Sequence, residues 1–212
     1  MENPYQVPKS APPPLPLPTT QGLLPVRFLA LAALWMFVGS TALAVADHLL
    51  RAFMMPQALS LHDTYYLEGP PLLEGAMILL GLGSVIPYLI WKYRAAWNAA
   101  RMSPAGMTVS PAMAVGSYFI PVVNFFLPCK AMAQITRVST GSVGGVALWW
   151  ATQLGGTLFG LVIGVIQGAN SPAAPGLLDH LYISLSVFSV FAAWRLIMDI
   201  TRAQTAARQG VD

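Results

Sequence analysis

The sequence predicts an all-α integral membrane protein with four transmembrane helices and a proline-broken re-entrant or interfacial segment between the second and third. Hydrophobic residues make up 56% of the 212 residues and charged residues only 9%, and mean hydropathy is +0.61. Soluble domains carry about 25% charged residues, so this chain lacks the polar surface that a fold in water requires. Four long apolar stretches and a one-sided distribution of Lys and Arg complete the argument.

Each of the four stretches approaches the length that a helix needs to cross the hydrocarbon core, which is about 20 residues. They cover residues 28–46, 72–91, 146–166 and 181–198. Pro87 lies inside the second stretch, and Arg195 falls near the end of the fourth. We therefore expect four membrane crossings.

Residues 109–128 are also apolar, but Pro121 and Pro128 flank Asn124 within them. Prolines break the helical hydrogen-bond ladder and leave backbone groups unpaired in lipid, where no water can satisfy them. A re-entrant or interfacial hairpin avoids this cost, and we favour it over a fifth span.

Charged residues distinguish the two sides of the expected bundle. The segment between the second and third spans has no acidic residue, and its basic residues are Lys92, Arg94, Arg101, Lys130 and Arg137. The loops on the other side are mainly acidic. The positive-inside rule then places the central segment and both termini in the cytoplasm of a bacterial inner membrane. A fifth crossing would separate Lys130 and Arg137 from the other three cations, which again favours four.

The chain divides into one membrane domain and two tails. Residues 12–18 read Pro-Pro-Pro-Leu-Pro-Leu-Pro, and residues 1–24 as a whole have almost no charge. Such a composition predicts a disordered, proline-rich cytoplasmic tail. Residues 25–204 are expected to form a single four-span domain, followed by a short cytoplasmic tail at 205–212.

Small residues predict how the last two spans pack. Glycine recurs every fourth residue in the third span, which places the glycines on one helix face and permits close approach of another helix. The glycines and the matching small residues of the fourth span are Gly156, Gly160, Gly164, Ser186, Ser189 and Ala193. We expect a tight antiparallel pair, with an oligomer interface as the alternative.

The basic residues and two polar residues are further candidates for contacts. Arg94, Asn98 and Arg101 fall on one face of an amphipathic helix, and Lys130, Gln134 and Arg137 fall on one face of another. This pattern predicts helices at the level of the lipid headgroups, and Lys92 is counted with their interfacial basic residues.

Asn124 and Gln153 lie at membrane depth, where a polar side chain is a candidate for function. Structural hydrogen bonding is the alternative for both: Asn124 with backbone groups of the broken helix, and Gln153 between helices.

All three histidines, His48, His62 and His180, are expected on the outer side, each beside an aspartate. Imidazole and carboxylate groups suit zinc, but the spacing of a metal motif is absent, and solvated loop residues are the commoner explanation. We expect no bound metal or other cofactor.

Several motifs resemble one known family. They are Trp91-x-Tyr93-Arg94 with Asn98, Ser110-Pro111, Phe119-Ile120-Pro121-x-x-Asn124 and Pro128. In these residues the chain is similar to bacterial membrane proteins of domain-of-unknown-function family 4328. The resemblance implies a multi-span protein and no established activity.

Motifs of hydrolases, metalloproteases, nucleotide-binding loops and thiol–disulfide enzymes are missing from the sequence, and no basic-aromatic platform for nucleic acid is present. We therefore expect a non-enzymatic accessory or scaffolding component that acts through helix packing and contacts with membrane lipids, other membrane proteins or a second copy. The alternative is a small transporter, channel or lipid-handling protein that uses the broken segment around Asn124. A cavity reaching Asn124 would favour this alternative, whereas a densely packed interior would favour the first hypothesis.

The topology is testable by cysteine labelling of intact cells. Reagents that cannot cross the membrane are expected to leave residues 92–137 unmodified from outside and to modify them after the membrane is opened. Labelling of this stretch from outside would contradict the four-span topology.

Overall fold

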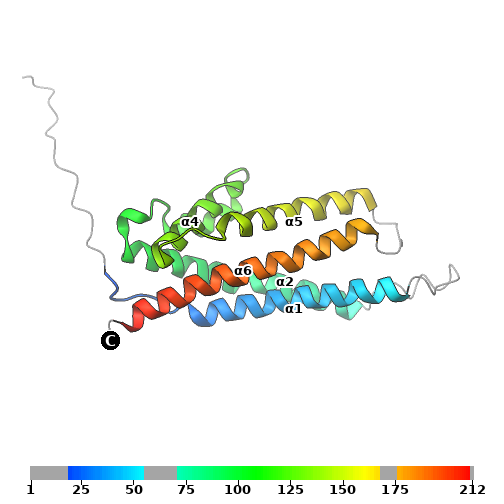
Figure 1. Ribbon diagram of the computed structural model, residues 1–212, viewed down its shortest axis with the longest axis horizontal. Helices are drawn as coiled ribbons and strands as arrows, with labels where there is room; N and C mark the ends of the chain where they lie inside the picture. The colour runs from blue at the N-terminus through cyan, green and yellow to red at the C-terminus, as the bar shows by residue number, and fades with distance from the viewer. Residues whose placement is uncertain (1–18, 55–70, 168–175, 211–212) are drawn as a thin grey trace, which may run out of the picture.

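The computed structural model describes residues 19–54, 71–167 and 176–210, and this part of the chain is helical, without strands (Figure 1). The long helices are α1 (Arg27–Met54), α2 (Pro71–Met102), α5 (Val146–Gln167) and α6 (Leu177–Gln209). Between α2 and α5 the elements are η3 (Pro104–Gly106), α3 (Pro111–Gly116), η4 (Ser117–Phe119), η5 (Val123–Phe125) and α4 (Leu127–Thr140).

The four long helices are long and apolar enough to cross a membrane, and they correspond to the four predicted spans. Pro87 lies inside α2 without ending it, so the helix continues through residue 102. With 32 and 33 residues, α2 and α6 are about 50 Å long at the standard helical rise, against about 30 Å of hydrocarbon. One end of each helix is therefore available to pack against the short elements.

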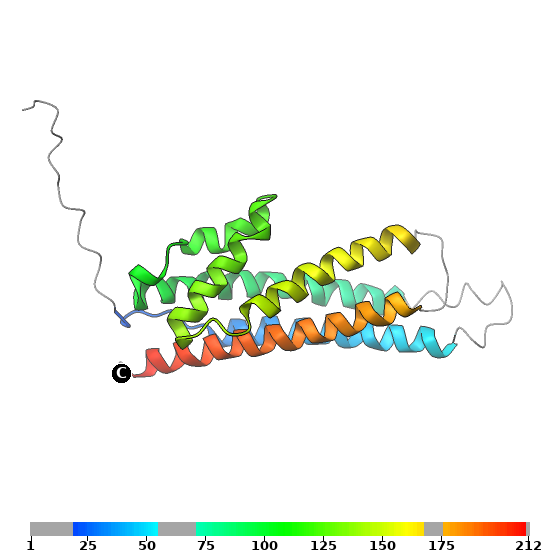
Figure 2. The ribbon, with the colours of Figure 1, turned by 45° about the horizontal axis from the view of Figure 1, so that its top comes forward.

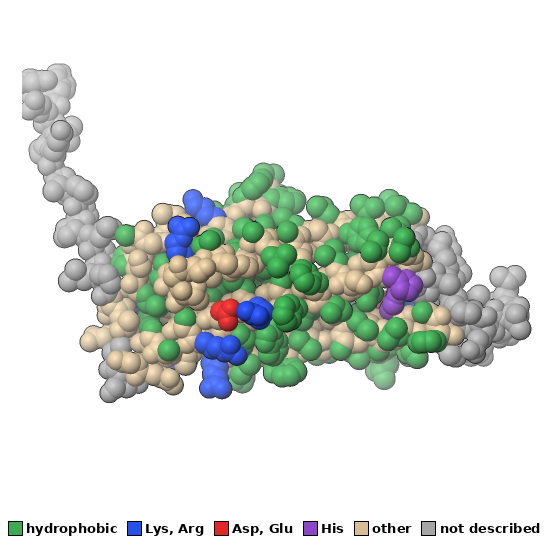
Figure 3. Space-filling view, in the orientation of Figure 1, with side chains coloured by type: hydrophobic (Ala, Val, Ile, Leu, Met, Phe, Trp, Pro, Cys, Tyr) green, Lys and Arg blue, Asp and Glu red, His purple; other side chains and the backbone are tan. Residues whose placement is uncertain are grey.

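The long helices lie side by side, with α1 against α2 and α6, and α5 against α6 (Figures 1 and 2). Buried apolar side chains are concentrated at the end of the bundle that carries α4. This core includes Trp91 and Ala95 on α2, Met132 and Ile135 on α4, and Ile200 on α6. Apolar residues of the other half remain exposed, and the space-filling view shows them as broad green areas (Figure 3). The fold thus combines a dense core at one end with an exposed apolar surface over the rest.

The proline-broken segment is bent rather than straight. Helical residues Pro104–Phe119 and Val123–Thr140 are bent by 116° relative to each other, which is the geometry of a broken span or a re-entrant loop. Ser110 starts α3, because its Oγ accepts a hydrogen bond from Met113 N and Pro111 occupies the first turn. At the bend Val122 has φ +65°, which is a strained conformation for a β-branched residue.

The tip of the bend is apolar and exposed. Phe119, Val122 and Phe126 have exposures of 72%, 69% and 72%. Trp150 on α5 donates its indole N–H to Phe125 O at 2.9 Å, which fixes the tip to the bundle. Figure 2 shows the tip projecting from one side of the bundle.

Both predicted tail boundaries need correction. Residues 19–24 belong to the fold: Thr19 N donates to Arg101 O, and the side chain of Leu23 is buried. At the other end α6 continues to Gln209, so residues 205–209 extend a helix. Hydropathy did not reveal either extension because the packing partners lie far away in the sequence. The proline-rich residues 1–18 lie outside the described residues.

The predicted glycine face lies partly against α6. An added Cβ at Gly160 would approach Tyr182 Cε2 to 3.0 Å, and one at Gly156 would lie 4.0 Å from Leu185 Cδ2. At Gly164 nothing lies within 4 Å. The glycines therefore pack against the larger α6 residues Tyr182 and Leu185, and not against the small α6 residues that the sequence predicted.

Those small residues make other contacts. Ser189 donates a hydrogen bond to the side-chain oxygen of Gln153, whereas Ser186 bonds the carbonyl of Tyr182 in its own helix. Ala193 is buried.

Gly160 and Gly164 provide a matched test of helix packing. Gly160→Leu is expected to lower the free energy of unfolding by about 1–3 kcal/mol, because the new side chain meets the Tyr182 ring. Gly164→Leu should leave the free energy of unfolding unchanged. Thermal unfolding in mild detergent measures both effects, and an equal response of the two variants would contradict this packing. A smaller complex on a native gel for Gly164→Leu alone would instead indicate an oligomer interface at that glycine.

Candidate functional site

A hydrogen-bonded polar network ties four segments together inside the dense core. The side-chain amide of Asn98 donates to Leu24 O at 2.9 Å and to Gln204 Oε1 at 3.0 Å, and it accepts from Leu24 N at 2.7 Å. Gln204 in turn donates to Ala95 O at 3.0 Å and Ser139 Oγ at 2.9 Å. Asn98 and Gln204 are 0% and 1% exposed. Since both amides are fully engaged, this network is a structural feature and offers little to a ligand.

Lys92 is buried nearby, with 0% exposure. Its Nζ donates to Tyr118 Oη at 2.8 Å and to Pro128 O at 3.2 Å, and it lies 5.8 Å from the centre of the Trp149 ring. No Asp or Glu of the described residues lies within 4.0 Å of it. The prediction that Lys92 faces the lipid headgroups is therefore wrong. The bent segment covers this side of α2, and the sequence pattern of α2 alone does not show that cover.

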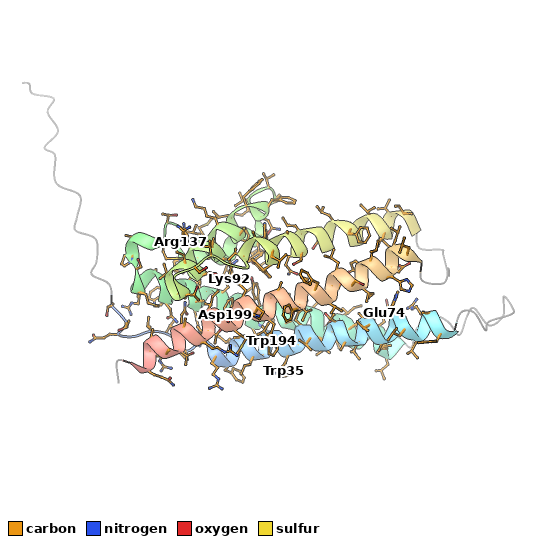
Figure 4. The ribbon with its side chains drawn as sticks, in the orientation of Figure 1. Trp35, Glu74, Lys92, Arg137, Trp194 and Asp199 are labelled. Carbon is orange, nitrogen blue, oxygen red and sulfur yellow. The ribbon has the colours of Figure 1, made fainter. Side chains whose placement is uncertain are left out.

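The other predicted interfacial cations remain at the surface. Arg101, Lys130 and Arg137 are exposed, whereas Arg94 is half-buried and donates to Pro25 O at 2.9 Å. Glu74 lies toward the opposite end of the bundle from Arg137 (Figure 4). The space-filling view likewise shows blue side chains toward one end and a histidine toward the other (Figure 3).

A cavity of about 350 Å³ lies among α1, α2, η4, α5 and α6, and it is partly open to the surface. Most of its wall is apolar, including Ala33, Phe37, Val85, Trp149, Ala193 and Ile197. Its polar residues are Ser84, Tyr88, Tyr118 and Gln153. A mostly apolar cavity with a few polar groups is the usual form of a small-molecule site.

The polar groups of the wall are connected to the buried cation. Tyr88 Oη and Tyr118 Oη are 2.8 Å apart, and Tyr118 also accepts the hydrogen bond from Lys92. A chain of three polar groups therefore runs from the buried ammonium to the cavity. Sequence analysis missed both tyrosines because residues 88 and 118 meet only through the bend of the proline-broken segment.

The two predicted polar candidates have different positions. Gln153 lines the cavity and accepts a hydrogen bond from Ser189, so it bridges α5 and α6. Asn124 does not line this cavity, and its Oδ1 is buried without a hydrogen-bond partner. The expected hydrogen bonds between the Asn124 amide and freed backbone groups are therefore not made by its oxygen.

Two of the three histidines meet at the far end of the bundle. The rings of His48 and His180 have centres 4.6 Å apart, whereas His62 lies outside the described residues. Asp47 pairs with Arg51 at 2.9 Å. The part of the chain that the structure describes contains no group of three or more potential metal ligands.

Lys92 and Gln204 offer a test that separates a buried functional group from a structural one. Lys92→Met is expected to leave the free energy of unfolding unchanged or raise it by up to about 3 kcal/mol, because burying an ammonium without a carboxylate is costly. Gln204→Met should lower it by about 1–3 kcal/mol, because Asn98 and Ser139 lose a partner. Thermal or denaturant unfolding of the detergent-solubilised protein measures both. A large loss of stability for Lys92→Met would mean that Lys92 mainly holds the fold together.

Comparison with known proteins yields a family and no closer relative. No curated protein and no solved structure matches the chain. The sequence pattern described as "Domain of unknown function (DUF4328)" matches residues 71–205, which extend from α2 into the last turns of α6 and include Lys92 and both cavity tyrosines. Helix α1, which packs against α2 and contributes to the cavity wall, lies before the matched region. Because the match covers more than half of the chain, this protein belongs to the DUF4328 family.

Proposed function

We propose that this protein is a non-enzymatic, multi-pass protein of the bacterial inner membrane that binds the apolar chain of a lipid-like molecule. The observation that carries the proposal is the cavity of about 350 Å³ with its mostly apolar wall. Its size falls in the usual range for small-molecule sites, about 300–1,000 Å³. Of the two functions expected from the sequence, this cavity supports lipid handling, although the broken segment contributes Tyr118 and Phe119 to its wall and not Asn124.

The surroundings of the cavity suit a ligand that arrives from the membrane. The cavity is partly open, and Phe119 and Val85 in its wall are also exposed on the outside. Phe119 belongs to the apolar tip of the bent segment. An alkyl chain that enters past these side chains exchanges one apolar environment for another and avoids water.

The chemistry of the wall supports binding rather than catalysis. The lining contains no carboxylate, imidazole or thiol. These groups are the usual acids, bases and nucleophiles of enzymes. Retention and release of an unchanged molecule is therefore the function we propose for the cavity.

The proposed orientation places α4 and both termini on the cytoplasmic side. Arg101 in the last turn of α2 and Lys130 and Arg137 on α4 are exposed, and the stretch between α2 and α5 contains no acidic residue. This charge bias is the one that the positive-inside rule associates with the cytoplasm. In this orientation the bent segment enters the membrane from the cytoplasmic side and returns to it, with Val122 and Phe126 at its apolar tip.

An accessory role through helix contacts remains a second candidate, supported by the outer half of α5. Gly164 has open space beside it, and its neighbour Val165 is 83% exposed. A small residue beside an exposed apolar one permits close packing of another membrane helix. The occupant of this face would be a membrane protein or a second copy of the chain.

A cavity-filling variant tests lipid binding. Ala33 is buried in the wall of the cavity, so Ala33→Phe is expected to occupy the space and reduce co-purifying acyl chains at least about tenfold, since the ligand loses much of its apolar contact. Ala42→Phe places the same side chain on an exposed position of α1 and should change nothing. Native mass spectrometry after gentle detergent extraction measures the bound molecules. Equal lipid retention by both variants and the parent chain would contradict the proposed function.

A further inference from the structure

The hydrogen-bonded groups Lys92, Tyr118 and Tyr88 at the cavity include one donor that has no acceptor. As an ammonium ion, Lys92 has no lone pair and can only donate, which it does to Tyr118 Oη and Pro128 O. Tyr118 and Tyr88 together carry two hydroxyl hydrogens, and the one bond between their oxygens uses one of them. Neither hydroxyl has a further acceptor among the described residues. One phenolic O–H at the cavity wall therefore lacks an acceptor, whichever tyrosine carries it.

The same end of the cavity also lacks a negative charge. The Lys92 ammonium is fully buried, and its neighbours are a phenol, a backbone carbonyl and the Trp149 ring. These groups solvate a cation only partly, and a carboxylate within a few ångströms is the usual compensation. The described residues supply none within 4.0 Å. The free phenolic O–H and the Lys92 ammonium would therefore both be satisfied by one kind of group, an anionic hydrogen-bond acceptor.

We propose that the cavity binds a fatty acid or a similar chain with its carboxylate against Tyr88 and Tyr118. This inference rests on the proposed function and specifies the polar end of its ligand. One carboxylate oxygen accepts the free phenolic hydrogen, and Lys92 acts through Tyr118 as a positioning residue that strengthens this donor. No bond of the ligand is made or broken.

The direction of the alkyl chain follows from the wall. Along α2 the lining runs from Tyr88 back to Gly81, which is about 10 Å of helix at the standard rise per residue. Phe37 and Val85 provide apolar contacts along this length. The carboxylate therefore lies at the end nearest α4 and the cations, and the chain extends toward the middle of the bundle.

Two sources of acyl chain would place an oxygen acceptor at this end: a free fatty acid and an esterified lipid. Both offer a carbonyl oxygen to the tyrosines, but only the free acid carries a charge at that position. Because Lys92 is unpaired, we commit to the free carboxylate. The distinction is measurable by comparing an acid with its methyl ester.

Photolabelling of the full chain in phosphatidylcholine nanodiscs tests the inference. The probe is a palmitic acid with a diazirine in its alkyl chain, and mass spectrometry identifies the labelled peptides, which are expected to include residues 81–89. Palmitate should compete at least about tenfold better than methyl palmitate, because hydrogen bonds to charged groups are stronger than neutral ones. Hexadecylamine, which has the same chain and a positive charge, should not compete.

Variants then assign the effect to the polar groups. The double variant Tyr88→Phe, Tyr118→Phe removes both phenolic donors and is expected to weaken competition by palmitate about tenfold. Lys92→Met should abolish the preference for palmitate over methyl palmitate while labelling persists. Tyr93→Phe is the matched control, because this exposed tyrosine of α2 lies outside the cavity lining, and it should behave like the parent chain.

The outcomes separate this inference from the proposed function. If residues 81–89 are labelled but acid, ester and amine compete equally in the parent chain, the carboxylate site is wrong and chain binding stands. Unchanged competition in the double tyrosine variant also overturns the inference. If the probe labels no cavity residue and Ala33→Phe retains the same lipids as the parent, the proposed function itself fails. The competition series uses the unaltered chain, so it remains decisive even if a variant does not fold.

Discussion

The structure depends on the requirement that polar groups withdrawn from water find hydrogen-bond partners within the protein. At the α4 end of the bundle, Asn98 and Gln204 meet this requirement together. Their amides connect the segment before α1, helix α2, helix α4 and helix α6. Close packing around them involves small residues such as Ala95 and Ala99 on α2, which let neighbouring elements approach. This end of the molecule is therefore held by directional bonds as well as by burial.

The remainder of the bundle obeys a different constraint. In the proposed membrane location, apolar surface there gains nothing from the hydrophobic effect by turning inward, because lipid is as apolar as the protein interior. Large side chains such as Leu79 and Phe191 accordingly remain exposed, and the helices leave the cavity between them. A dense core around polar residues and a more loosely packed apolar region thus coexist in one domain. The cavity lies where the two regions meet, which explains why an apolar wall ends at a tyrosine pair and a buried lysine.

Much of the fold was predictable, because it depends on local composition. The length of each apolar stretch identified the four long helices, and Pro121 and Pro128 identified the interrupted segment whose bend the structure shows. The candidate site was far less predictable. The sequence grouped Lys92 with the surface cations because it lies close to them along the chain. In the structure it is buried because Tyr118 and Pro128 of the bent segment cover it. Likewise, Tyr88 appears in the sequence as an ordinary aromatic residue of a span. Its partner Tyr118 lies on η4, and no local sequence pattern shows that the bend brings η4 against α2.

The long sequence separations in the Asn98 network bear on how the protein is made. Leu24 precedes Asn98 by 74 residues, and Gln204 follows it by 106. During synthesis on the ribosome, α1 and α2 are complete well before the glutamine that completes the network exists. A chain that terminates early leaves the Asn98 carboxamide short of a partner in a nearly finished bundle. The last turns of α6 therefore complete the network, and the α4 end of the bundle is fully hydrogen-bonded only once almost the whole chain has been synthesised.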